Sequence, residues 1–222
     1  SSAELPLGLL LESTRFEPGY VLFNKILATI IPWPQFIFFA VAIISVSAVS
    51  YFIYKNSIDP FLSILFYVTL GTMTFQLTAF RQAIAISICL VSTEFIKKKE
   101  LSKFIILVLL ACTFHKTAIV FVPFYFLANR QKTPINNLLS ILAFIVAILY
   151  AESITQFGNE LLDMDYAGYI GNKWGGLVSI TIYAVALILS WFNSKKVDDK
   201  LTFNMTLIGM IIYCMRYTTL AL

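Results

Sequence analysis

Long apolar runs separated by short polar segments dominate the chain. The clearest run is Trp33–Tyr54, which contains no charged side chain. A helix needs roughly 20 apolar residues to cross the hydrocarbon core of a bilayer. The pattern therefore predicts a membrane-spanning helix over Trp33–Tyr54.

The next apolar run, Phe61–Thr93, contains a single charged residue, Arg81. One helix of that length would extend about 50 Å at about 1.5 Å per residue, which is too long for one crossing. Gly71 and Arg81 both interrupt the run. We therefore expect two spans that meet near Arg81.

A third run, Phe104–Asn129, is interrupted by His115 and Lys116. It predicts either one long kinked helix or two short arms that meet at His115. Arms this short would be re-entrant or broken helices shielded by protein. Further spans are expected over Pro134–Ala151, Trp174–Ser194 and Leu201–Met215. The predicted fold is an all-α, polytopic transmembrane helical bundle, forming one integral membrane domain over residues 1–222.

The composition agrees with a membrane protein. Hydrophobic residues make up 59% of the chain and charged residues 13%, whereas a soluble domain carries roughly 25% charge. The net charge of +4 comes from loop lysines, so we expect no nucleic-acid binding. The cysteines lie in apolar runs without metal-binding spacing, and no nucleotide-binding motif is present, so neither a metal nor a cofactor is expected.

Lysines between the runs predict the orientation of the helices, because cytoplasmic loops are enriched in Lys and Arg. The cytoplasmic loops should contain Lys55, then Lys97, Lys98, Lys99 and Lys103, then Lys195, Lys196 and Lys200. The loop Phe157–Gly175 has Lys173 as its one basic residue and should face outside. If Phe104–Asn129 is a pair of arms, the turns at Arg81 and His115 face outside as well.

Arg81 is the first candidate for function, because an unpaired guanidinium in an apolar run costs several kcal/mol. It either extends to the outer interface, pairs with a carboxylate, or binds an anion through bidentate hydrogen bonds. A helix that begins nearby would point free N–H groups at the same anion. The small residues Ala85, Cys89 and Ser92 follow at helical spacing and predict close helix packing.

His115 is the one histidine of the sequence. Its ordinary pKa near neutrality suits a general base or a phosphate ligand, although a hydrogen-bonded histidine at a helix break is equally typical. Lys116 is either an interfacial anchor or a ligand contact. Thr117 is expected to cap the second arm.

Glu17 lies in the sequence "RFEPGY", where Pro-Gly is a turn signal. It could pair with Arg81 or Lys25, act as a base, or belong to an ordinary loop. Further along, "DMDYAGYIGNKWGG" holds Tyr166, Tyr169 and Trp174. These aromatic residues are typical of an interfacial belt and would also serve as a platform for sugar rings.

The block "RQAIAISICLVSTEFIKKKELSKFIILVLLACTFHKTAIVFVPFYFL", Arg81–Leu127, resembles the central part of the EpsG family. These are Wzy-like polymerases of bacterial exopolysaccharide and O-antigen. The matching positions are Arg81, Gln82, Ala85, Lys99, Lys103, Phe104, Phe114, His115, Thr117, Ala118 and Pro123. The segments "EPGY" at Glu17–Tyr20 and "DYAGY" at Asp165–Tyr169 are also similar to the family. Members of the family are longer, so this chain would be a portion of such a polymerase.

The resemblance implies a multi-pass protein of the bacterial inner membrane. It would be a glycosyltransferase-type enzyme that joins oligosaccharide repeat units carried on polyprenyl diphosphate, at the outer face and without a cofactor. Its diphosphate-binding residues would be Arg81, Gln82 and Lys116, its catalytic residues His115 and Glu17, and its sugar-binding residues Tyr20, Tyr166, Tyr169 and Trp174. Membrane lipid and a regulator of polysaccharide chain length would be further partners.

Two other functions remain open from the sequence. One is a transporter or flippase of lipid-linked glycans, and the other is a membrane acyltransferase that uses a histidine. Inverted internal repeats would favour transport, and the sequence shows none.

Overall fold

The computed structural model describes residues 8, 14, 16–57, 59–69 and 72–128, and every regular element there is helical. The helices are α2 (Pro18–Ile30), α3 (Phe36–Asn56), α4 (Pro60–Thr69), α5 (Thr72–Thr78), α6 (Phe80–Lys97), α7 (Leu101–Phe114), the 3-10 helix η1 (Lys116–Phe121) and α8 (Val122–Ala128). The all-α prediction is therefore confirmed for this part of the chain.

The chain groups into two compact units, Ser1–Val122 and Pro123–Leu222. Helices α2 to α7 and η1 belong to the first unit, which also contains the candidate site. The expected spans Pro134–Ala151, Trp174–Ser194 and Leu201–Met215 lie outside the described residues, so they stay predictions, as does the single membrane domain.

The structure contains a helix, α3, in the run Trp33–Tyr54 where a membrane span was expected. A turn in which the Phe36 N–H donates to the Trp33 carbonyl precedes it, so the helix begins at Phe36 and ends at Asn56. Large apolar side chains remain uncovered along it, including Ile43 (63% exposed) and Phe39 (56% exposed), as expected of a helix surrounded by lipid. Among the described helices α3 is the one long and apolar enough to cross a membrane. The multi-pass bundle stays a prediction.

Helices α4 and α5 together form a second candidate span, but they are bent by 64° at the break between them. The first of the two spans expected within Phe61–Thr93 is therefore a broken helix. The sequence places Gly71, a poor helix former, between the two helices. The expected helix boundary near Arg81 is confirmed, because α5 ends at Thr78 and α6 begins at Phe80.

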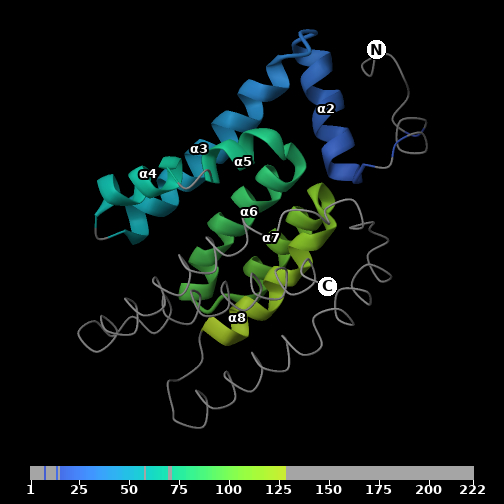
Figure 1. The fold of residues 1–222 in the computed structure, drawn as a ribbon. Coiled ribbons are helices and arrows are strands. Elements are labelled where there is room, and N and C mark those ends of the chain that lie inside the picture. The colour runs from blue at the N-terminus through green and yellow to red at the C-terminus, as the bar shows by residue number, and fades with distance from the viewer. Residues whose placement is uncertain (1–7, 9–13, 15, 58, 70–71, 129–222) are drawn as a thin grey trace, which may run out of the picture. The chain divides into compact units, whose positions relative to one another are not determined.

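Helix α6 packs against both α3 and α7 (Figure 1). Its small residues Ala85, Cys89 and Ser92 are buried, and Ala85 and Cys89 share an apolar cluster with Ala111 of α7. Small side chains allow helix backbones to approach closely. The packing role predicted for this stripe is confirmed.

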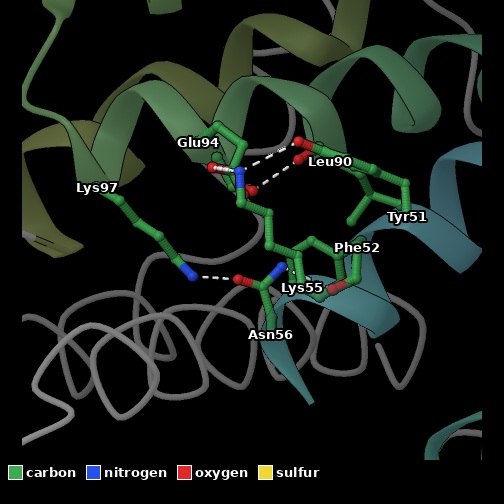
Figure 2. A network of polar contacts seen from close by, with 8 residues as sticks. Tyr51, Phe52, Lys55, Asn56, Leu90, Glu94 and Lys97 are labelled. Atoms are coloured by element: carbon green, nitrogen blue, oxygen red, sulfur yellow. Dashed lines mark hydrogen bonds and ion pairs between the residues drawn. The ribbon is translucent and has the colours of Figure 1, made fainter. Parts of the chain in front are cut away.

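A polar network joins α3 to the C-terminal end of α6 (Figure 2). Lys55 Nζ of α3 lies 2.5 Å from Glu94 Oε2 of α6, and Lys97 Nζ donates a hydrogen bond to Asn56 Oδ1. Lys55 and Lys97 therefore lie at the same end of these two helices. The predicted orientation, which places both lysines on the cytoplasmic side, requires this arrangement.

The break expected at His115 is also confirmed, because α7 ends at Phe114 and η1 begins at Lys116. The capping role of Thr117 is wrong: His115 occupies the N-cap position of η1, and Thr117 lies inside that helix. The turn expected at Pro18–Gly19 is instead the start of α2. Proline favours the first helical position, because its fixed φ suits a helix and its missing N–H is not needed there.

Candidate functional site

Three charged or titratable residues from distant segments meet at one carboxylate. Glu17 Oε2 accepts a hydrogen bond of 2.6 Å from Arg81 Nη1, and Glu17 Oε1 lies 3.3 Å from His115 Nδ1. The backbone N–H of Lys116 also donates to Oε1, at 3.4 Å. One side chain therefore bridges a guanidinium and an imidazole. We call Glu17, Arg81 and His115 the carboxylate-bridged cluster.

The start of α2 positions the Glu17 side chain. Glu17 is the N-cap residue, and its carbonyl accepts the N–H groups of Tyr20 and Val21 at 3.0 and 3.1 Å. Its side chain does not cap its own helix. The carboxylate is therefore free to reach across to α6 and η1.

Gly19 brings α2 against the end of α7. A Cβ at this position would lie 2.3 Å from Thr113 Oγ1 and 2.8 Å from the Thr113 carbonyl oxygen. No side chain fits in that space, so the close approach depends on glycine. Because His115 follows Thr113 by two positions, this approach brings the imidazole within reach of Glu17.

Arg81 lies in the first turn of α6, as the sequence predicted. Its guanidinium carbon is 4.8 Å from the centre of the Phe16 ring, within the range of a cation–π contact. The Arg81 side chain is 36% exposed, whereas that of Glu17 is 5% exposed. The bond to Glu17 uses Nη1, and an arginine has five N–H donors, so the guanidinium has further donors that this bond does not use.

The two titratable groups of the cluster lie outside the α-helices, Glu17 before α2 and His115 between α7 and η1. Burial alone would raise the pKa of the Glu17 carboxyl. Hydrogen bonds from its own backbone and from Arg81, together with the Arg81 charge, outweigh burial and hold that pKa below its ordinary value. Glu17 is therefore a carboxylate at neutral pH.

Burial lowers the pKa of His115, and the nearby Arg81 charge lowers it further. The charge of Glu17 and its hydrogen bond raise the pKa of His115, but they do not outweigh these effects. At neutral pH the imidazole is therefore mostly neutral, which is the form that accepts a proton.

The structure also describes three other expected site residues, Gln82, Lys116 and Tyr20, beside the cluster. Gln82 follows Arg81 on α6 and is half-buried. Lys116 contributes its backbone N–H to Glu17. The Tyr20 ring packs on an apolar cluster around Val41 and lies edge-on to Phe16, with ring centres 5.8 Å apart. The remaining expected sugar-binding residues, Tyr166, Tyr169 and Trp174, are outside the described residues.

Sequence reasoning missed two residues of this region, Phe16 and Gly19. Both lie in the segment "RFEPGY" that had drawn attention for Glu17. Within the described part of the chain, no three His, Cys, Asp or Glu side chains come together as a metal site would require. The chemistry available here is anion binding by Arg81 and proton transfer at an imidazole.

Comparisons with known proteins give a family. No curated protein and no solved structure matches the chain. The sequence model of the EpsG family matches residues 3–222, which include all three members of the carboxylate-bridged cluster. The match extends over almost the whole sequence, so the chain belongs to the EpsG family.

Proposed function

We propose that this protein is a polysaccharide polymerase of the bacterial inner membrane. It joins oligosaccharide repeat units carried on polyprenyl diphosphate, at the outer face of that membrane. EpsG membership makes the chain an exopolysaccharide-related membrane protein, and α3 is long and apolar enough to span a bilayer. The observation that carries the proposal is the bridging of Arg81 and His115 by one buried carboxylate.

The cluster offers what glycosyl transfer from a lipid diphosphate needs. An acceptor hydroxyl attacks the anomeric carbon of the donor sugar, and the diphosphate leaves as an anion. A cation must stabilise the leaving group, and a base must take the hydroxyl proton. Arg81 is a partly exposed cation with N–H donors beyond the one bonded to Glu17, which suits the first task, and neutral His115 suits the second.

Neighbouring residues would complete the substrate contacts. Gln82 and Lys116, adjacent to Arg81 and His115 in sequence, are proposed as further ligands of the diphosphate. Tyr20, Tyr166, Tyr169 and Trp174 are proposed as the surface for sugar rings. A regulator of polysaccharide chain length is a further proposed partner.

The proposed outer location follows from the two ends of α6. Arg81 and Glu94 are separated by about 20 Å along the helix, at about 1.5 Å per residue. Lys55 and Lys97 accompany Glu94 at one end, and positive charge favours the cytoplasmic side. With that end inside, the carboxylate-bridged cluster faces outside.

The proposal is tested in a strain that lacks its own polymerase. Arg81→Lys keeps the charge but removes the planar fork that binds phosphate oxygens in pairs. We expect wild-type protein to restore long polymer and Arg81→Lys to leave single repeat units on the outer face. Lys97→Arg, at the opposite end of α6, is the matched control and should behave as wild type.

Two results would contradict the proposal. Wild-type polymer length in the Arg81→Lys strain would rule out Arg81 as the diphosphate ligand. Repeat units held on the cytoplasmic side would indicate a flippase of lipid-linked glycans instead. Immunoblots of the membrane fraction must show equal amounts of both variants.

A further inference from the structure

We infer that Glu17 is a positioning residue that couples the base to the diphosphate ligand. Its carboxylate holds His115 through Nδ1 and Arg81 through Nη1, which leaves His115 Nε2 to accept the proton of the attacking hydroxyl. The inference rests on the proposed function. It also separates two residues, Glu17 and His115, that the sequence left as equivalent catalytic candidates.

Burial argues against Glu17 as the base itself. Its side chain is 5% exposed, and each of its oxygens already faces a donor of the protein. A general base must come within about 3 Å of the proton that it removes. A carboxylate enclosed in this way is suited to orienting its neighbours.

The contact to Glu17 also decides which nitrogen of His115 is the base. A carboxylate can only accept hydrogen bonds, so the nitrogen that faces it, Nδ1, carries the proton. In a neutral imidazole the other nitrogen, Nε2, then has the free lone pair. A carboxylate behind a catalytic histidine has this orienting effect in other enzymes as well.

Arg81 is held from two directions by adjacent residues. The Glu17 carboxylate binds Nη1, and the Phe16 ring lies under the guanidinium. Donors fixed before the substrate arrives stabilise developing charge without a cost of reorganisation during the reaction. Residues 16 and 17 therefore orient the guanidinium, while the Arg81 side chain as a whole stays 36% exposed.

The charges on both sides of Glu17 change in the same step. The hydroxyl oxygen bonds to the anomeric carbon, and the bond from that carbon to the diphosphate oxygen breaks. The bonding electron pair leaves with the diphosphate near Arg81, and the hydroxyl proton moves to His115 Nε2. The new imidazolium lies beside the Glu17 carboxylate, which stabilises it. The proton then passes to the departing diphosphate or to water, and His115 is neutral again.

Nuclear magnetic resonance of the full chain in lipid nanodiscs tests this assignment. Because the sequence contains one histidine, labelling with ¹⁵N-histidine reports the tautomer and the pKa of His115 alone. The charged groups that face or adjoin His115 are Glu17, Arg81 and Lys116. We expect the wild-type protein to show a protonated Nδ1 and an unprotonated Nε2.

Two variants should shift the titration in opposite directions. Glu17→Gln removes the charge that raises the pKa of His115, so that pKa should fall further. Arg81→Gln removes a charge that lowers it, so the pKa should rise. Glu94→Gln is the matched control, because Glu94 is also a buried carboxylate of an ion pair, 2.5 Å from Lys55 at the far end of α6. This control should titrate as wild type.

An unchanged His115 pKa in Glu17→Gln, or a protonated Nε2 in the wild type, would overturn the inference. Opposite shifts in the two variants cannot arise from a shared loss of folding. Binding of a C55 polyprenyl diphosphate without sugar separates this inference from the proposed function. If the lipid does not bind while His115 shifts as expected, the proposed function fails, and what remains is that Glu17 orients His115 and Arg81. If it binds while His115 does not shift, the positioning role fails.

Discussion

Replacing Gly19 with alanine should disturb both the stability of the protein and the carboxylate-bridged cluster. The added Cβ would lie 2.8 Å from the carbonyl oxygen and 2.9 Å from the carbonyl carbon of Thr113. An ordinary van der Waals contact is 3.4–4 Å, so α2 must retreat by about 0.6 Å (3.4 − 2.8). Overpacking of this kind costs about 1–3 kcal/mol.

The Thr113 side chain offers no easy relief. Its Oγ1 would lie 2.3 Å from the new Cβ, and it donates a hydrogen bond of 2.7 Å to the Leu110 carbonyl. Rotating the hydroxyl away loses that bond, worth about 1 kcal/mol, and leaves the contact with the backbone. Movement of α2 also lengthens the 3.3 Å contact of Glu17 with His115 beyond hydrogen-bonding range.

Thermal unfolding in detergent measures the first effect, and polymer length in cells measures the second. At about 2–4 °C per kcal/mol for a chain of this size, Gly19→Ala should unfold several degrees below the wild type. It should also make shorter polymer. Gly8→Ala is the matched control, because nothing lies within 4 Å of a Cβ at that position. Unfolding of Gly19→Ala at the wild-type temperature, with full polymer length, would refute the close approach of α2 to α7.

Three further predictions concern pH, the inner polar network and orientation. Polymerase activity should be lost as pH falls through the pKa of His115, because a protonated imidazole cannot act as a base. Burial lowers that pKa, so the loss of activity should be centred below about pH 6.5. A pH profile centred above that value would contradict this prediction. Lys55→Ala should lower the unfolding temperature more than Lys97→Ala. Loss of Lys55 leaves the buried Glu94 carboxylate without a counter-charge, whereas Lys97 bonds to the neutral amide of Asn56. Equal unfolding temperatures of the two variants would refute this prediction. In a background without native cysteines, a membrane-impermeant maleimide added to intact cells should label Thr117→Cys. It should label Lys97→Cys only when it has access to the cytoplasmic face of the membrane. The reverse pattern would contradict the predicted orientation.

The helices and their breaks were largely predictable from the sequence. Helix α3 was visible as a long run without charge, and the boundaries at Arg81 and His115 were visible because polar residues interrupt apolar runs. The start of α2 was missed because Pro-Gly is typical of turns, while proline is equally favoured at the first helical position.

The candidate site was predictable only in part. Pairing of Arg81 with Glu17 was one of several open alternatives, because a cation in an apolar run needs an anion and few were available. The meeting of His115 with the same carboxylate depends on the approach of α2 to α7 at Gly19. Hydrophobic periodicity indicates where helices begin and end, but it does not indicate which helices become neighbours. For the same reason Phe16 could not be placed under Arg81 in advance.

The central claim, that this protein joins lipid-linked repeat units, is tested most directly with purified components. The full chain in nanodiscs is incubated with polyprenyl-diphosphate-linked repeat unit and no other protein, and the products are separated by length. We predict a ladder whose steps differ by one repeat unit, with one polyprenyl diphosphate released per step, and no ladder from the Arg81→Lys variant. Absence of a ladder from wild-type protein that moves the same lipid across vesicle membranes would contradict the claim.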